Sequence, residues 1–305
     1  MRRFTVFVLV FCAIVTFGAL VPRHNSVCHT LFRHSMFRRA GLVVHAAQLP
    51  ANWRTGECED KSDHWGRPHV CQMRQTTFTL PAGRLSVSTT NGGIQVMGED
   101  RQDVELDAKV TAWAPSEAEA QDLLNQIAID IDNGNVRDHG PRMSFMDRTG
   151  YNVSYKLHVP KHLTGMEVHS MNGGIELSKL DGELKFATTN GGVELSDLSG
   201  DVKGQTVNGG LEIALSGDRW QGEGLDAVTT NGGIEMHVPA NYSAHLETST
   251  VNGGISVGFP VTVQGEIKNH LDTNLGSGGA TVHVQTTNGG VEISRSGSGS
   301  ANTSD

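Results

Sequence analysis

The tripeptide Asn-Gly-Gly occurs seven times in this chain of 305 residues, and this repetition constrains the fold more than any other feature. From Asn172 onward, consecutive copies are 18, 18, 23, 21 and 36 residues apart, and Ser277-Gly278-Gly279 partly fills the last interval, which is twice 18. A period near 20 residues is typical of repeat folds in which each unit packs only against its neighbours. The seven copies begin at Asn91, Asn172, Asn190, Asn208, Asn231, Asn252 and Asn288.

Each repeat unit contains two short segments with the periodicity of β-strands. After every Gly-Gly comes an apolar-polar-apolar triplet such as Ile175-Glu176-Leu177, which predicts a half-buried strand. Asp181-Gly182 then predicts a turn before a second alternating segment. We expect the Asn and Gly residues of the corners to supply the positive φ angles that tight turns need, and so to act as structural turns.

Two architectures are compatible with such units. In a β-solenoid, each unit is one coil, and equivalent residues such as Ile175, Val193 and Leu211 form an internal ladder. In a β-meander, each Asn-Gly is instead a hairpin turn between antiparallel strands. The near-constant period and the recurrence of the same residues at the same phase favour an all-β solenoid.

The segment between the first and second copies has a different pattern. Alternating residues predict strands near 103–112 and 151–159, and Pro115 is followed by a helix signature in which Ser116 caps and Glu119 lies three residues on. An N-terminal cap of strands and one helix would cover the open end of a solenoid. The predicted divisions are a signal peptide or membrane anchor at 1–47, a Cys-containing loop at 48–74, the cap at 75–165, the solenoid at 166–294 and a disordered tail at 295–305.

The N-terminus has the layout of an export signal. Phe4 to Val21 is an unbroken apolar run preceded by Arg2 and Arg3, and small-residue cleavage sites occur near residues 44–47. Cleaved export is favoured, and a retained membrane anchor is the alternative. The first 45 residues hold six Arg and no acidic residue, so the remaining body is acidic and unsuited to binding nucleic acid.

Two cysteines remain beyond the predicted leader. Cys58 and Cys71 lie in a Gly-, Asp- and His-rich loop, and an even pair in an exported chain favours a disulfide. A zinc site with His64 and His69 is the alternative, but the spacing matches no standard zinc pattern.

The charged and aromatic residues yield few candidate sites. A recurrent Glu follows five of the Gly-Gly pairs, and it forms either a surface for cationic ligands or, as we favour, a solvated face that keeps the strands soluble. Trp220 is the best single candidate for a ligand contact, although packing against the coil edge is favoured. The segment Asp130–Asn135 is similar to the start of a calcium loop but is better interpreted as a turn. We identify no catalytic, cofactor-binding or metal-binding residues. The recurrent glutamates are Glu176, Glu194, Glu212, Glu235 and Glu292.

Taken together, these motifs resemble a bacterial family of adhesin-like cell-envelope proteins of unknown function with β-strand repeats. The resemblance spans about residues 70 to 294. It is carried by the segments 89–96, 153–160, the close-set units from Asn172, and 275–293. It implies a β-helical, exported or membrane-associated protein linked to surface attachment or envelope upkeep, and it brings no catalytic residues.

The expected function is therefore that of a non-catalytic adhesin or envelope scaffold. Its location would be extracytoplasmic, in the periplasm, outer envelope or medium, and its partner an unidentified envelope or surface protein or polysaccharide. Contact with a membrane would occur only through residues 4–21, if they are retained. Two alternatives stay open: a carbohydrate-active β-helix enzyme, which needs two converging carboxylates, and a membrane-anchored sensor of envelope stress.

Overall fold

The computed structural model describes residues 53–58, 66–142, 148–262 and 268–296, all within the compact unit Val44–Asp305. The expected leader or anchor at 1–47 lies outside the described residues, as does the predicted tail from residue 297 onward. The described chain is all-β apart from one helix, and its strands form two sheets. We call the eleven-stranded sheet I and the ten-stranded sheet II. In the described part of the chain, no helix has the length and apolar character needed to cross a membrane.

Every repeat unit contributes one strand to each sheet. The strands in sheet II each end at an Asn of an Asn-Gly-Gly corner, and they are β3 (Arg84–Asn91), β9 (His162–Asn172), β11 (Asp181–Asn190), β13 (Ser199–Asn208), β15 (Gly224–Asn231), β17 (Ala244–Asn252) and β20 (Thr281–Asn288). The shorter strands that follow each corner lie in sheet I, and they are β4 (Ile94–Glu99), β10 (Ile175–Ser178), β12 (Val193–Ser196), β14 (Leu211–Ala214), β16 (Ile234–Val238), β18 (Ile255–Val257) and β21 (Val291–Arg295).

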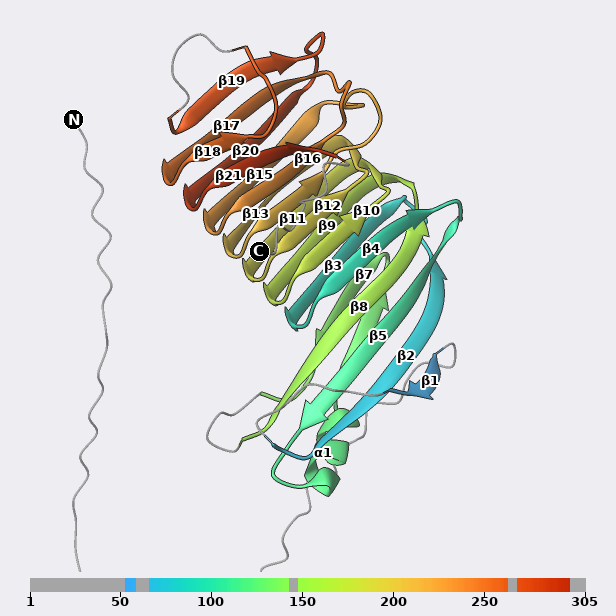
Figure 1. Ribbon diagram of the computed structural model, residues 1–305. Helices are drawn as coiled ribbons and strands as arrows, with labels where there is room; N and C mark the ends of the chain where they lie inside the picture. The colour runs from blue at the N-terminus through green and yellow to red at the C-terminus, as the bar shows by residue number, and fades with distance from the viewer. Residues whose placement is uncertain (1–52, 59–65, 143–147, 263–267, 297–305) are drawn as a thin grey trace, which may run out of the picture. The chain divides into compact units, whose positions relative to one another are not determined.

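Equivalent strands of neighbouring units pair in parallel and in register, so the units are coils of a solenoid. Ile175 pairs with Val193, and Val193 with Leu211, which confirms the predicted ladder and excludes the meander. Figure 1 shows the coils side by side from β3 and β4 to β17 and β18. Alternate residues of both sheets point inward, and these apolar side chains form one continuous buried core.

The spatial order of the coils differs from their order in the sequence. The coil of β20 and β21 lies between that of β15 and β16 and that of β17 and β18, although it comes last in the chain. The gap of 36 residues, although it is twice the 18-residue interval, therefore holds no additional coil. It contains β19 (His270–Leu275), which pairs antiparallel with β17 at the end of sheet II, and Gly278 in the turn that leads back into β20.

Sheet I continues past the first coil into a cap of long antiparallel strands. The cap strands are β1 (Arg54–Glu57), β2 (His69–Thr79), β5 (Asp103–Trp113) and β8 (Gly150–Pro160). The hairpin of β6 (Ala128–Asp132) and β7 (Asn135–His139) extends sheet II beyond β3. The predicted cap range of 75–165 thus also holds β3 and β4, which pair in register with the repeat coils.

The predicted helix is confirmed as α1 (Glu117–Leu124). The Ser116 hydroxyl accepts a hydrogen bond from the backbone N–H of Glu119 at 3.3 Å, as the sequence pattern indicated. Ala120 and Leu124 are buried, so the apolar face of the helix contributes to the core.

Candidate functional site

The recurrent glutamates form a straight row on the outer face of sheet I. Glu176 pairs with Glu194 and Glu194 with Glu212, and the row then continues through Glu235 and Glu292. Parallel in-register strands place equivalent side chains one strand spacing apart, about 4.8 Å. The displaced last coil keeps this row unbroken, because it inserts Glu292 beside Glu235 and leaves Ser256 beyond it.

A groove of about 1200 Å³ runs along this row. Its floor is made by the second glycine of each corner, which has no side chain to fill the sheet face. The flanking carboxylates form one wall. We call this feature the glutamate groove, and its members from the repeat coils include Gly174, Gly192, Gly210, Gly233, Gly290, Glu176, Glu194, Glu212, Glu235 and Glu292.

The corners that shape the groove are held by a ladder of asparagine side chains. Asn190 Nδ2 donates to Asn172 Oδ1 at 2.8 Å, and Asn208 Nδ2 donates to Asn190 Oδ1 at 2.9 Å. Six such bonds connect all seven asparagines in the spatial order of the coils. Each Asn-Gly-Gly is therefore a corner between the two sheets, and its asparagine links neighbouring coils.

The corner backbone corrects our expectation of positive φ. No asparagine of the seven corners has a positive φ, and among their glycines only Gly92 does. The first glycine is needed for another reason: a Cβ at Gly191 would overlap the carbonyl oxygen of Gly173 in the neighbouring coil. Positive φ occurs instead at the opposite corner, for example at Lys179 and Gly182.

A buried hydroxyl completes every corner, and the sequence analysis did not identify it. Thr188 Oγ1 donates to the Gly173 carbonyl at 2.9 Å, and Thr206 Oγ1 donates to the Gly191 carbonyl at 2.8 Å. The signal was present, because the residue two positions before each asparagine is always Thr or Ser: Thr89, Ser170, Thr188, Thr206, Thr229, Thr250 and Thr286.

The glutamate row carries negative charge that the protein compensates only in part. Gln95 Nε2 donates to Glu176 Oε1 at 2.8 Å, and His237 Nε2 lies 3.4 Å from Glu235 Oε1. Partial burial raises the pKa of Glu194, and the neighbouring charges of Glu176 and Glu212 raise it further. The free groove therefore favours the addition of positive charge.

The groove ends at the cap, where the charge pattern changes. Gln95 of β4 pairs with Lys156 of β8, and Lys156 pairs with Asp107 of β5. Lys109 also lines this end. The Oδ1 atom of Asp107 is buried and, within the described residues, has no hydrogen-bond partner. The acidic row thus has a defined end, with an unsatisfied acceptor just beyond it.

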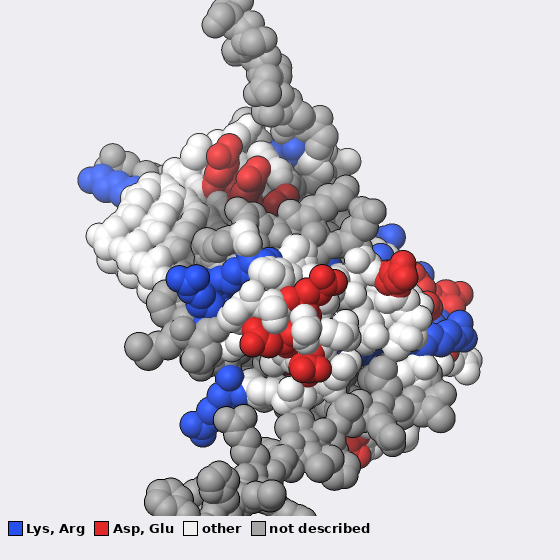
Figure 2. All heavy atoms as spheres, turned by 90° about the horizontal axis from the view of Figure 1, so that it is seen from below, with Lys and Arg blue, Asp and Glu red and all other residues white. Residues whose placement is uncertain are grey.

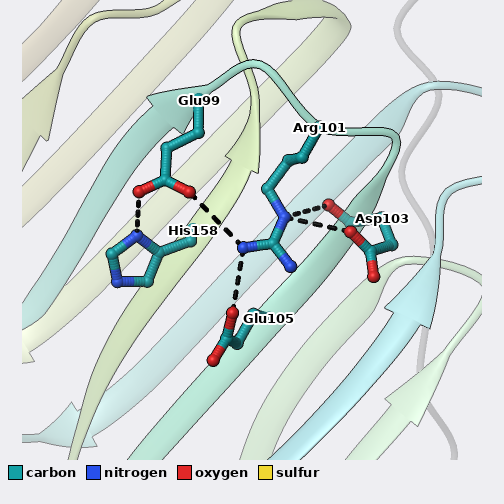
Figure 3. Close-up of polar contacts among 5 residues, drawn as sticks. All are labelled: Glu99, Arg101, Asp103, Glu105 and His158. Carbon is teal, nitrogen blue, oxygen red and sulfur yellow. Dashed lines mark hydrogen bonds and ion pairs between the residues drawn. The ribbon is translucent and has the colours of Figure 1, made fainter.

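A second network of charged side chains connects the first coil to the cap (Figure 3). Arg101 Nη1 lies 3.0 Å from Glu105 Oε2 and 3.5 Å from Glu99 Oε2, and Arg101 Nε lies 3.0 Å from Asp103 Oδ1. His158 Nδ1 lies 2.6 Å from Glu99 Oε1. The hydrogen bond with His158 is the main cause that lowers the pKa of Glu99, and the charges of His158 and Arg101 add to it. These contacts link β4, β5 and β8, so the network is structural.

Trp220 packs against the coil edge, as the favoured interpretation of the sequence predicted. Only 6% of its surface is exposed, and its indole Nε1 donates to the Gly200 carbonyl at 3.0 Å. It packs among Leu195, Ile213 and Leu225 at the coil edge. The suggestion that Trp220 contacts a ligand from an outward loop is corrected accordingly, since its ring is not accessible for stacking.

The predicted disulfide is confirmed, with Cys58 and Cys71 bonded and their Cα atoms 5.6 Å apart. Both sulfur atoms are used, which removes the zinc alternative. The calcium-loop alternative at 130–135 is a two-residue hairpin in which Asn133 and Gly134 both have positive φ. Within the described ranges, no group of three or more His, Cys, Asp or Glu side chains is placed to hold a metal ion.

Charged side chains of both signs also lie on another face of the molecule (Figure 2). Figure 2 shows the face seen from below, where acidic and basic side chains form separate small patches with uncharged surface between them. On what is drawn of this face, no basic patch is continuous enough to follow a phosphate backbone.

Comparisons with known proteins give one family match and several distant structures. Residues 60–294 match the family model described as Toastrack DUF4097. A candidate cell adhesion protein from Clostridium sporogenes ATCC 15579 is 11% identical, with a TM-score of 0.39 over 74% of this chain and 100% of that chain. A candidate adhesin from Bacteroides fragilis NCTC 9343 is 14% identical, with a TM-score of 0.32 over 73% and 97% of the two chains.

A candidate lipid binding protein from Parabacteroides distasonis ATCC 8503 is 8% identical, with a TM-score of 0.26 over 74% of this chain and 96% of that chain. At these TM-scores, the likenesses carry no argument about function. No curated protein matches the chain.

Proposed function

Because the chain belongs to the Toastrack DUF4097 family, which matches it over residues 60–294, we propose that it is a non-catalytic, extracytoplasmic adhesin or envelope scaffold. The observation that carries this proposal is the glutamate groove, which lies open along the outer face of sheet I. An open face of repeated, identical contacts suits the binding of an extended partner better than the binding of a small substrate.

The arrangement of carboxylates favours binding over catalysis. Glycoside hydrolysis needs two carboxylates on opposite sides of the bond that is cleaved. The glutamates of the groove instead project side by side from adjacent parallel strands, as the pairing of Glu194 with Glu212 shows. The sensor alternative depends on residues 4–21, which lie outside the described residues.

The disulfide supports a location outside the cytoplasm. Structural disulfides persist in oxidising compartments and are rare in the cytosol, where thiols are kept reduced. The bond joins Cys58, directly after β1, to Cys71 near the start of β2, so it links two neighbouring strands of sheet I. Export with an intact disulfide is therefore part of the proposal.

The test is to fractionate cells that produce the chain and to measure its intact mass before and after reduction and alkylation. We expect it outside the cytoplasm, with Cys58 and Cys71 alkylated only after reduction. In parallel, removal of the chain should reduce attachment of the cells to a surface at least twofold, and complementation should restore it. A cytoplasmic chain with free thiols, or attachment unchanged on removal, would contradict the proposal.

A further inference from the structure

Three glutamates of the groove form no ion pair with a Lys or Arg side chain of the described residues. In the described part of the chain, neither Glu194, Glu212 nor Glu292 makes an ion pair with Lys or Arg, although such pairs occur elsewhere on the strands, as between Lys185 and Glu183. Like charges held one strand spacing apart repel one another, so a bound cation would relieve this repulsion.

The elongated shape of the groove favours an extended chain that carries several positive charges. The glycine floor leaves a trough along the stack axis, so a chain can approach the sheet backbone closely. Five carboxylates span four strand spacings, roughly 19 Å, which six residues of extended peptide cover at about 3.3 Å each. Three side chains of such a peptide would face the glutamates, and the aliphatic stems of lysine would cover the glycine floor.

The cap end adds a second, independent feature. The Oδ1 atom of Asp107 is buried without a hydrogen-bond partner in the described residues, and it lines the groove just beyond Lys156. A buried acceptor without a donor costs about 1 to 3 kcal/mol. Because this atom has essentially no solvent-exposed surface, a donor from an occupant would reach it only if the Asp107 side chain turned toward the groove.

We propose that the glutamate groove binds an extended, lysine-rich peptide segment of a partner protein, laid across the strands of sheet I from β21 toward β4. This inference rests on the proposed function, because it names the partner chemistry of that same binding face. The complementarity of charge and the length of the trough carry it, and the row of carboxylates supplies several weak pairs in place of one strong pocket.

The test is a fluorescence anisotropy titration of the full chain with a fluorescein-labelled hexalysine peptide at low salt. The double variant Glu194→Gln/Glu212→Gln removes the centre of the row. The matched control Glu167→Gln/Glu247→Gln removes the same charge from sheet II, where Glu167 lies on β9 and Glu247 on β17. We expect the groove variant to weaken Kd at least fivefold and the control to change it less than twofold, with thermal unfolding showing that both variants are folded.

Three results would overturn the inference. Equal weakening by both variants would show unspecific attraction to a chain of net charge −9. Absence of hexalysine binding at low salt would show that the groove does not take this ligand. Calcium binding that is lost in the groove variant, without hexalysine binding, would assign the row to a metal ion. If the cells still depend on the chain for attachment in any of these cases, the inference fails while the proposed function stands.

Discussion

At the scale of single residues, the two glycines of each corner have different roles. A Cβ at Gly191 would overlap the Gly173 carbonyl, whereas a Cβ at Gly192 would lie 3.6 Å from the Gly210 carbonyl, an ordinary contact. The Thr206 hydroxyl donates to the Gly191 carbonyl, so the same crowded corner is also closed by a buried hydrogen bond. The first glycine therefore allows the coils to stack, and the second leaves the groove open.

The adjacent glycines provide a matched pair of substitutions. Gly191→Ala should lower the free energy of unfolding by about 2 kcal/mol or more, because the backbone must shift to relieve the overlap. Gly192→Ala should change it by less than about 1 kcal/mol, since that Cβ has space. Urea denaturation of both variants gives the comparison. If the two variants were equally stable, the coils would not be packed closely enough at Gly191 to exclude a Cβ atom.

At the scale of elements, one polar contact holds the helix to a strand within the cap, and a second connects the cap to the first coil. Arg74 of β2 is 3% exposed, and its guanidinium donates to the carbonyls of Ile127 at 2.6 Å and Leu124 at 3.0 Å. It thereby satisfies backbone groups at the C-terminal end of α1, where a positive charge is also favoured by the helix dipole. The ion pairs of Arg101, together with the contact between Glu99 and His158, connect β4 of the first coil to β5 and β8 of the cap.

Replacement of Arg74 tests the first contact. Arg74→Met keeps the length of the side chain but removes the charged donor from the Ile127 carbonyl and leaves the Leu124 carbonyl with only the backbone N–H of Ile127, at 3.3 Å. We expect it to lower the free energy of unfolding by about 2 kcal/mol or more. Arg74→Lys should be less damaging, because the ammonium group can still reach one carbonyl. Hydrogen exchange in α1 should increase in the Met variant. Unchanged exchange there would show that Arg74 does not hold the helix.

The pH dependence of stability tests the second contact. The folded-state pKa of Glu99 is lowered, so its pairing with His158 and Arg101 stabilises the fold above the pKa of the unfolded chain, about 4.3. This contribution is lost as the pH falls through the lower folded-state pKa. Glu99→Gln should therefore lower Tm at pH 6 and lower it less at pH 3.

The control for that series is Glu247→Gln, because Glu247 makes no ion pair within the described residues. Its effect on Tm should not follow the same pH dependence. A Tm difference between the wild type and Glu99→Gln that is the same at both pH values would mean that the hydrogen bond with His158 does not form in solution.

At the scale of the whole molecule, the last coil in the sequence is an internal coil of the stack. Within the described residues, β17 pairs only with β19 and β20, and β18 pairs only with β21. The coil of β17 and β18 therefore depends on strands that are made after it. Assembly of this end of the stack has to bring β20 and β21 between two units that are consecutive in the chain.

Deletion of residues 270–305 tests this dependence. It removes β19, β20 and β21, so residues 244–257 lose every strand partner that the structure gives them. We expect these residues to exchange their amide hydrogens as an unfolded segment does, whereas β13 and β14 keep their protection. If residues 244–257 stayed protected, they would have paired directly with β15 and β16, and the inserted order would not be required for stability.

The sequence by itself determined the coil and its repetition. The alternation around residues such as Ile175 and Leu177 determines which side chains face the core. The constant position of Asn-Gly-Gly in each unit makes equivalent residues stack, because strands with a two-residue period and a fixed corner can pair with their neighbours in only one register. The helix at 117–124 was equally local, since its cap and apolar stripe lie within a few residues.

Only the tertiary structure decided how the corners work, which coil neighbours which, and where the binding face lies. The same Asn-Gly dipeptide forms a positive-φ hairpin at Asn133 and a ladder corner at Asn190, because the choice depends on a neighbouring coil that the local sequence does not contain. The order of coils likewise depends on long-range pairing. It places Glu292 beside Glu235, and so converts scattered glutamates into one continuous row along a groove.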